Sequence, residues 1–77
     1  MKARIVVTLK PSVLDPQGKA IEGALNSLGL SGFASVRQGK VFDIELEGGA
    51  DADARLRQAC EKLLANTIVE NYAIEHE

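Results

Sequence analysis

The segment LDPQGKA, residues 14–20, marks the point at which a strand pattern gives way to a helix pattern. Asp15 and Pro16 form a strong helix start, because an aspartate side chain caps free amides and the fixed φ of proline suits the first helical turn. Gly18 stands where a capping box would place Glu or Gln, and Lys19 follows it. Glycine costs a helix about 1 kcal/mol relative to alanine, and a cation in the first turn opposes the helix dipole. Gly18 and Lys19 therefore indicate that a contact with something outside the helix favours these two residues.

Hydrophobic periodicity on either side of this segment predicts alternating strands and helices. Strands are expected at residues 3–10, 33–38, 40–47 and 68–75. Helices are expected at residues 15–29, with Gly29 as the stop, and from residue 51 or 53 to about residue 66. The two middle strands meet at Gly39, and a tight connection that contains glycine typically forms a hairpin.

This order, β-α-β-β-α-β, is that of a single α+β domain spanning residues 1–77. Two helices on one face of a four-stranded antiparallel sheet make a ferredoxin-like sandwich, and right-handed crossovers place strands 3–10 and 40–47 at its centre. Between the layers we expect the apolar side chains of the strands and of the second helix: Ala3, Ile5, Val7, Leu9, Phe42, Ile44, Leu46, Ala52, Leu56, Ala59, Cys60, Leu63, Tyr72 and Ile74. The first helix carries its apolar residues at helical spacing: Ala20, Ile21, Ala24, Leu25 and Leu28.

The opposite face of the sheet is expected to carry a small apolar centre with a charged rim. Val6, Thr8 and Val41 form the centre, flanked by charged residues of the same strands. A domain of fewer than about 80 residues seldom gains more than about 3 to 5 kcal/mol from one core, so many depend on disulfides, a metal or a partner chain. One cysteine and one histidine leave no disulfide and no Cys/His metal cluster. We therefore predict a homodimer, or a higher homo-oligomer, that pairs through Val6, Thr8 and Val41.

Charge and composition exclude several functional classes. The net charge is −2 with both signs interspersed, and the aromatic residues are one tyrosine and two phenylalanines. The chain thus lacks both a basic stripe and a stacking platform, and we do not expect it to bind nucleic acid. It has neither a signal-peptide pattern nor the ~20 apolar residues of a membrane span. Its free thiol is typical of the cytoplasm, where we expect the protein to act.

No arrangement of side chains indicates catalysis. Cys60 lies on the apolar stripe of the second helix, where burial is a simpler explanation than a reactive thiol. His76 is next to the last residue, where a solvated side chain is favoured over a catalytic one. Asp51 and Asp53 lie at a helix start, where capping outweighs metal binding. We predict neither catalytic nor metal-binding residues on this chain.

Gly18 and Lys19 are the strongest candidates for a binding surface. A glycine at the third helical position leaves free N–H groups open to another molecule, and Lys10 adds a second cation near them. Such a spot suits a carboxylate of a partner protein or a phosphate of a ligand. The alternative is that Gly18 is merely tolerated and that Lys19 points to water. Arg37 and Lys40 flank the expected hairpin and are second candidates, with simple solvation as their alternative.

Several blocks of the sequence match one known family. The most specific is LDPQGKA, preceded by Leu9-Lys10-Pro11 and Val13. Weaker matches are Ala24-Leu25, Leu28-Gly29, Val36-Arg37, Gly39-Lys40, Leu63-Leu64-Ala65-Asn66, Glu70 and Tyr72. On these blocks the chain resembles the PurS family, the small subunit of the multi-subunit phosphoribosylformylglycinamidine synthase of purine biosynthesis. Thr67 departs from the family's usual proline, and Asn71 from its usual acidic residue.

The resemblance implies a non-catalytic partner of two enzymes. In the family's complex a glutaminase subunit releases ammonia from glutamine, and a large synthetase subunit uses ATP, with magnesium, to aminate formylglycinamide ribonucleotide. The small subunit, as a dimer, is implied to hold the two together and to help retain the ammonia, with no cofactor of its own. Its docking surface is then expected to comprise Lys10, Asp15, Gly18, Lys19, Arg37 and Lys40.

Two other functions share the expected topology. A small-molecule sensor of the ACT type is the main alternative, and saturable binding of amino acids or purine nucleotides without partners would distinguish it. An acylphosphatase-like enzyme would need an arginine in the first loop. Residues 9–18, LKPSVLDPQG, contain none.

Overall fold

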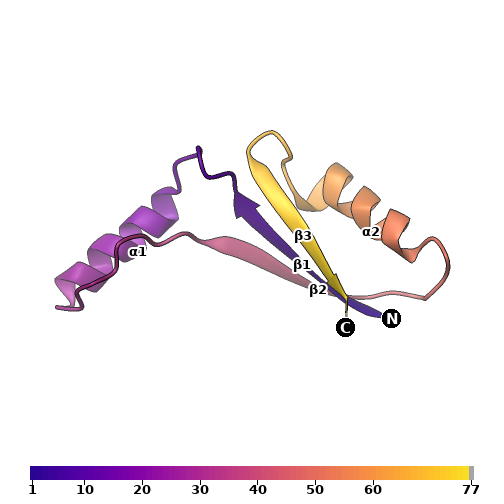
Figure 1. Cartoon of the computed structure of the whole chain (residues 1–77), viewed down its shortest axis with the longest axis horizontal. Helices are drawn as coiled ribbons and strands as arrows, with labels where there is room; N and C mark the ends of the chain where they lie inside the picture. Colours follow the sequence, from indigo (N-terminus) through magenta and orange to yellow (C-terminus); the bar gives the residue numbers. More distant parts are fainter. Residues whose placement is uncertain (77) are drawn as a thin grey trace.

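The computed structural model describes residues 1–76 and contains a three-stranded antiparallel sheet, with one helix beside the sheet and another on a projecting arm (Figure 1). The strand order is β2-β1-β3, with β1 at Lys2–Leu9, β2 at Gly39–Glu45 and β3 at Glu70–His76. Ile5 at the centre of β1 lies opposite Phe42 on one side and opposite Ile74 on the other. This register places the apolar positions of the three strands side by side on one face.

The core lies between this face and the second helix. α2, Ala52–Ala59, continues into a π-helical turn, η1, at Cys60–Leu64. Alternation along β1 sends Ala3, Ile5 and Val7 into the core, where all three are buried. The remaining core positions come from the helical segment and from the outer strands: Leu56, Cys60, Leu64, Ala65, Phe42, Ile44, Leu46, Tyr72 and Ile74. The predicted inward positions of the strands are thus confirmed except for Leu9, which is half-buried outside the core, and the burial of Cys60 is confirmed.

The prediction for the end of the second helix is wrong at Leu63. Its side chain is 81% exposed, whereas Leu64 packs against the core. A π-helical turn takes more residues than an α-helical turn, so the position that returns to the core face after Leu56 and Cys60 comes one residue later. The helical segment also ends at Leu64, before the expected end near Asn66.

The first helix begins and ends where the sequence indicates. α1 is Pro16–Ser27, with Asp15 as its N-cap. Gly29 follows with a φ of +79°, the left-handed conformation that glycine adopts without strain. Residues 30–38 then run back beside α1 towards β2 (Figure 1). We call α1 and the residues up to 38 the arm.

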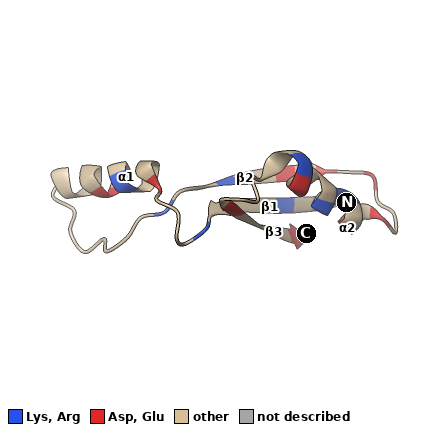
Figure 2. Ribbon diagram, turned by 90° about the horizontal axis from the view of Figure 1, so that it is seen from above, with Lys and Arg blue, Asp and Glu red and all other residues tan. Residues whose placement is uncertain are grey.

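The arm makes the molecule long and thin. The molecule extends 50 × 25 × 15 Å and has a radius of gyration of 15.8 Å. A compact chain of this length would have a radius of gyration of about 11 to 12 Å. Seen from above, the arm continues beyond the end of the sheet, and charged residues of both signs lie along both parts (Figure 2).

The structure corrects the predicted sandwich in three linked ways. Residues 33–38 belong to no strand of the described chain, Gly39 begins β2 instead of turning a hairpin, and the sheet has three strands rather than four. β2 is therefore an edge strand, and α1 lies away from the sheet (Figure 1). The cause is that the chain runs straight on through Gly39, whereas a hairpin needs a loop of at least two residues to reverse it. The coarser prediction of an α+β fold with an antiparallel sheet and two helices is confirmed.

The last strand begins two residues later than predicted. Residues 66–69 form a turn in which the amides of Val69 and Glu70 donate to the carbonyl of Asn66, at 3.0 and 2.7 Å. Within residues 1–76, no helix is both long enough and apolar enough to cross a membrane.

Candidate partner-binding site

The side chain of Asp15 connects α1 to the extended half of the arm. Its Oδ1 accepts a hydrogen bond from the amide of Gly18 at 3.0 Å, and its Oδ2 accepts one from the amide of Gln38 at 2.6 Å. The residue is only 5% exposed. The amide of Gln38, followed by that of Gly18, holds the pKa of Asp15 below its ordinary value. Asp15 is thus an ionised helix cap that also fixes a distant segment.

Gly18 lies directly against that extended segment. The residue is buried, and a Cβ added to it would collide with the carbonyl oxygen of Val36 and lie 2.8 Å from Oδ2 of Asp15. Only glycine lets the two segments approach so closely. The expectation of a sterically open helix tip is therefore wrong, because the chain's own backbone occupies the space beside Gly18.

Arg37 fixes the loop that leads into α1. Its guanidinium group donates to the carbonyl oxygens of Lys10 at 3.0 Å and Val13 at 2.9 Å. One planar side chain thus satisfies two carbonyl groups of the loop between β1 and α1. Arg37 therefore orders the loop in which Lys10 lies, rather than projecting freely into solvent.

Two further contacts within the arm were missed by the sequence reasoning. The side-chain amide of Gln38 donates to Oε1 of Gln17 at 2.6 Å, and the backbone amide of Val36 donates to Oε1 of Glu22 at 2.9 Å. Polar residues at these helix positions are equally typical of a helix face exposed to solvent. The spacing of Gln17 and Glu22 in the sequence therefore does not predict that they bind residues 36–38. The arm is consequently an ordered unit, in which residues 36–38 are hydrogen-bonded along α1.

The predicted lysines lie at the surface around this unit. Nζ of Lys19 is 3.5 Å from Oε2 of Glu22, and Nζ of Lys40 is 3.8 Å from Oε2 of Glu70. The two lysine side chains are 66% and 62% exposed. The side chains of Glu22 and Glu70 are only 19% and 14% exposed, so each lysine has an acidic partner on one side and can meet a partner protein's carboxylate on its exposed side.

The face of the sheet opposite the core carries the expected apolar centre. Val6 is half-buried and lies between Val41 on β2 and Ala73 on β3. Val41 and Thr8 are exposed. The grouping of Val6, Thr8 and Val41 on one face is confirmed, and its use as an interface stays a prediction.

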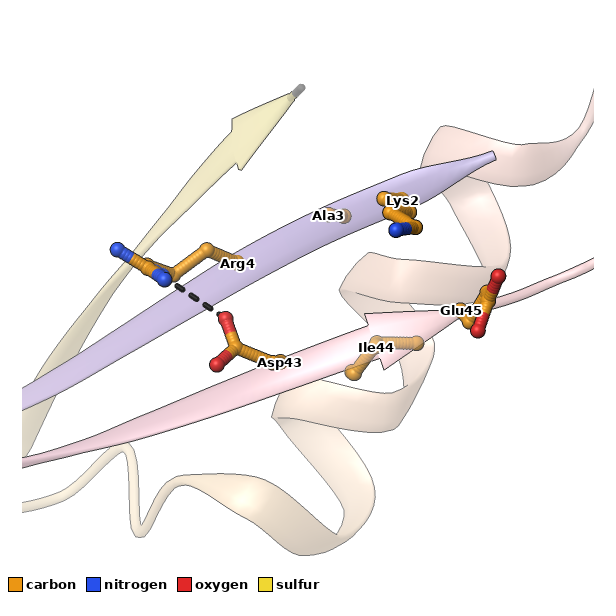
Figure 3. Close-up of a pocket in the computed structure, with 6 residues that line it drawn as sticks. All are labelled: Lys2, Ala3, Arg4, Asp43, Ile44 and Glu45. Atoms are coloured by element: carbon orange, nitrogen blue, oxygen red, sulfur yellow. Dashed lines mark hydrogen bonds and ion pairs between the residues drawn. The ribbon is translucent and has the colours of Figure 1, made fainter.

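A shallow hollow of about 340 Å³ lies on β1 and β2 near the N-terminus (Figure 3). Nε of Arg4 is 2.8 Å from Oδ1 of Asp43 across the two strands. The lining residues are Lys2, Ala3, Arg4, Asp43, Ile44 and Glu45. The charged side chains of this lining are all exposed to solvent, so the hollow is suited to surface contact rather than to catalysis.

The cysteine, the histidine and the acidic residues that could have carried catalysis or bound a metal each have contacts within the fold. Burial raises the pKa of the Cys60 thiol, which keeps it protonated and unreactive. His76 is not a free tail residue, because it ends β3 and its Nε2 lies 2.8 Å from Oδ1 of Asp53. Asp51 is the N-cap of α2 but makes no side-chain capping bond, and it pairs with Arg55 at 3.3 Å instead. Across residues 1–76, no group of His, Cys, Asp and Glu side chains is placed to hold a metal ion.

Comparison with known proteins connects this arrangement to one family. The family model described as "PurS: Phosphoribosylformylglycinamidine (FGAM) synthase" matches residues 2–77. The chain belongs to the PurS family. The PurS subunit of phosphoribosylformylglycinamidine synthase from Synechocystis sp. is 49% identical over 74 residues, which are 94% of this chain and 74% of the relative. The corresponding PurS subunit of Mycobacterium leprae is 46% identical, over 99% of this chain and 95% of the relative.

Solved PurS structures share the whole shape, including the arm. The structure of Bacillus subtilis PurS matches with a TM-score of 0.91 at 44% identity, covering 99% of this chain and 98% of that chain. Methanocaldococcus jannaschii PurS, one of the subunits of formylglycinamide ribonucleotide amidotransferase in the purine biosynthetic pathway, matches with a TM-score of 0.86 at 36% identity, covering 96% and 92%. A chain of the Thermotoga maritima PurLQS structure matches with a TM-score of 0.83 at 33% identity, covering 96% and 93%. The resemblance based on LDPQGKA is confirmed.

Proposed function

We propose that this chain is the assembly subunit of a phosphoribosylformylglycinamidine synthase, which holds a glutaminase subunit and a large synthetase subunit together. The match to PurS over residues 2–77 carries this proposal. The likeness to a chain of the Thermotoga maritima PurLQS structure supports an assembly role. The chain itself has no active site in this proposal.

The chemistry of the proposed complex belongs to the partner subunits. The glutaminase releases ammonia from glutamine, and the synthetase uses ATP and magnesium to activate the amide oxygen of formylglycinamide ribonucleotide and to replace it with that ammonia. This chain supplies no cofactor. By keeping the two enzymes in contact, it helps to prevent the loss of ammonia to solvent. The free thiol of Cys60 suits a complex in the cytoplasm.

The docking surface in this proposal is the arm, the loop before it and the start of β2. Lys10, Lys19 and Lys40 present the cations that meet carboxylates of a partner subunit. The other proposed residues, Asp15, Gly18 and Arg37, act from within by holding the arm in shape. A fixed arm loses little conformational entropy on binding, which favours a tight contact.

The proposed subunit is a homodimer or a higher homo-oligomer. Its core is small, since only seven apolar residues are buried among residues 1–76, while large apolar side chains along the arm and the helical segment stay exposed. Val6, Thr8 and Val41 offer a contact face on the sheet. Covering such groups with a second chain removes apolar surface from water and stabilises both copies.

Reversing the charge of Lys19 tests the docking surface. Lys19→Glu should weaken co-elution of this chain with the glutaminase and synthetase subunits by about tenfold in affinity, the effect of one lost charged contact of about 1.4 kcal/mol. The isolated variant should stay folded, because glutamate in the first turn of α1 suits the helix dipole better than lysine. Lys62→Glu, with the same charge change on η1, is the matched control and should co-elute normally. Equal co-elution of the two variants would argue against the surface.

A further inference from the structure

A hollow of about 450 Å³ lies where the arm joins the sheet. Its lining comes from the end of β1, the loop that follows β1 and the extended half of the arm: Thr8, Leu9, Pro11, Ser35, Arg37 and Gln38. Sites that bind small molecules usually have volumes of about 300 to 1,000 Å³. The hollow is therefore large enough for a small metabolite, and the side chains of its lining determine which class of molecule it suits.

The lining of this hollow is positively charged. Arg37 is its one charged residue, although the chain as a whole has a net charge of −2. Other hollows on the described part of the chain include carboxylates in their linings: Asp43 and Glu45, Asp15 and Glu70, Asp53, or Glu61 and Glu70. A hollow that contains a cation and no carboxylate favours an anionic ligand.

The guanidinium group of Arg37 is held in place through one of its nitrogens. Nη2 makes both of the hydrogen bonds to the carbonyl oxygens of Lys10 and Val13. Among residues 1–76, no carboxylate forms an ion pair with Arg37, and Nε and Nη1 have no acceptor. The N–H groups of Nε and Nη1 therefore remain available to a ligand. Because the side chain is already ordered, it loses little conformational entropy when it binds.

Two hydroxyl groups add further donors to the same hollow. Thr8 and Ser35 are exposed, and neither hydroxyl group has a hydrogen-bond partner within residues 1–76. A phosphate group has more acceptor oxygens than a carboxylate, so it can accept from the guanidinium group and from both hydroxyl groups together. Leu9 and Pro11 add apolar surface, which suits a carbon skeleton attached to the phosphate. The lining as a whole thus favours a phosphate ester over a carboxylate.

We propose that this hollow binds the phosphate group of a small phosphomonoester. Arg37 donates to the phosphate from Nε and Nη1, Thr8 and Ser35 donate from their hydroxyl groups, and the apolar part of the lining contacts the carbon skeleton. Thr8 comes from the sheet and Ser35 from the arm, so a bound ligand connects the two parts and fixes the arm relative to the sheet. Thr8 also belongs to the face predicted to pair with a second copy, which places the site at the border of that face. The inference goes beyond the proposed function, in which Arg37 only holds the arm in shape.

An NMR titration of the isotope-labelled full chain locates the site. The probes are ribose 5-phosphate and inorganic phosphate, with free ribose as the uncharged control. Ribose 5-phosphate should shift the amide signals of Thr8, Ser35 and Arg37 saturably, and free ribose should leave them unchanged. Tighter binding of ribose 5-phosphate than of inorganic phosphate would support a phosphomonoester, whereas the opposite order would overturn that choice of ligand. The absence of saturable shifts at these three residues would overturn the site itself.

Two pairs of variants test the donors one at a time. Ser35→Ala removes a donor without touching the bonds of Arg37 to the loop, so the dissociation constant of ribose 5-phosphate should rise about tenfold. Ser31→Ala removes an exposed hydroxyl group elsewhere on the arm and should bind as the wild type does.

Removal of the cation should have a larger effect than removal of a hydroxyl group. Arg37→Gln should abolish saturable binding, whereas Lys62→Gln, which removes a cation from η1, should not change it. Circular dichroism shows whether each variant is folded, and Ser35→Ala still tests the site if Arg37→Gln is not. Wild-type affinity in Ser35→Ala, or an equal loss in Ser31→Ala, would overturn the proposal. These titrations use this chain alone, so their failure leaves assembly with the two enzymes to be judged by co-elution.

Discussion

The identity of Gly18 is explained by a contact with a segment that is distant in the sequence. Within α1 alone glycine is unfavourable, yet the carbonyl of Val36 and the carboxylate of Asp15 leave no room for a Cβ. The unfavourable residue is thus explained by the arm rather than by an open tip for a ligand. The specificity of LDPQGKA follows, because Asp15, Gln17 and Gly18 each contact the same extended segment.

Replacement of Gly18 by alanine should be destabilising despite alanine's higher helix propensity. The added methyl group forces the arm apart, and overpacking of this kind costs about 1 to 3 kcal/mol. Gly23→Ala is the control, because a Cβ at Gly23 meets nothing within 4 Å. That variant should gain about 0.5 to 1 kcal/mol. Urea unfolding followed by circular dichroism measures both, and two stabilised variants would refute the role given to Gly18.

Asp15 should make the stability of the protein depend on acid pH. Its pKa is lowered from the ordinary 3.8 by the amides of Gln38 and Gly18, so the folded state favours the carboxylate. The resulting stability is complete above the unfolded pKa of about 4. It is lost as the pH falls through the lower pKa of the folded state.

Replacing Asp15 by asparagine should remove this part of the pH dependence of stability. The free energy of unfolding of Asp15→Asn should fall less steeply between about pH 5 and pH 3 than that of the wild type. Glu47→Gln, which changes an exposed carboxylate, is the control and should follow the wild type. Urea titrations at several pH values measure the slopes. Identical slopes for wild type and Asp15→Asn would mean that the buried carboxylate contributes nothing to stability.

The π-helical turn after α2 decides which leucine supports the core. Leu64→Ala should cost about 1 to 2 kcal/mol, because Leu64 is half-buried against the core. Leu63→Ala should change the free energy of unfolding by less than about 0.5 kcal/mol, since this side chain is 81% exposed. Chemical unfolding of the two variants side by side measures the difference. A larger loss at Leu63 would indicate ordinary α-helical spacing through η1.

Local pattern predicted most elements and failed where a second segment decides the outcome. Alternation placed Ile5 and Val7 in the core, and the Asp-Pro start and Gly29 bounded α1, because these signals lie within each element. Residues 33–38 carry a strand pattern, but the pattern does not reveal that they lie beside α1 instead of joining the sheet. In the candidate site, the lysines could be placed at the surface, whereas the bonds from Asp15 and Arg37 needed the arm's geometry.

The whole molecule is too extended to be explained as an isolated domain. Its radius of gyration of 15.8 Å exceeds the compact value of about 11 to 12 Å, and its apolar arm residues face solvent. An extended shape and exposed apolar side chains are both typical of a subunit that binds other chains. Membership of the PurS family places the chain in an enzyme complex, which is consistent with the proposed assembly role.

Amidation of formylglycinamide ribonucleotide by a reconstituted mixture tests the proposed assembly role most directly. Glutaminase and synthetase subunits are assayed with ATP and magnesium, with and without this chain, and with either glutamine or ammonia as the nitrogen source. Omitting the chain should abolish the reaction with glutamine and leave the reaction with ammonia unchanged. Equal loss of both reactions, or full activity with glutamine in its absence, would contradict the role of assembly subunit.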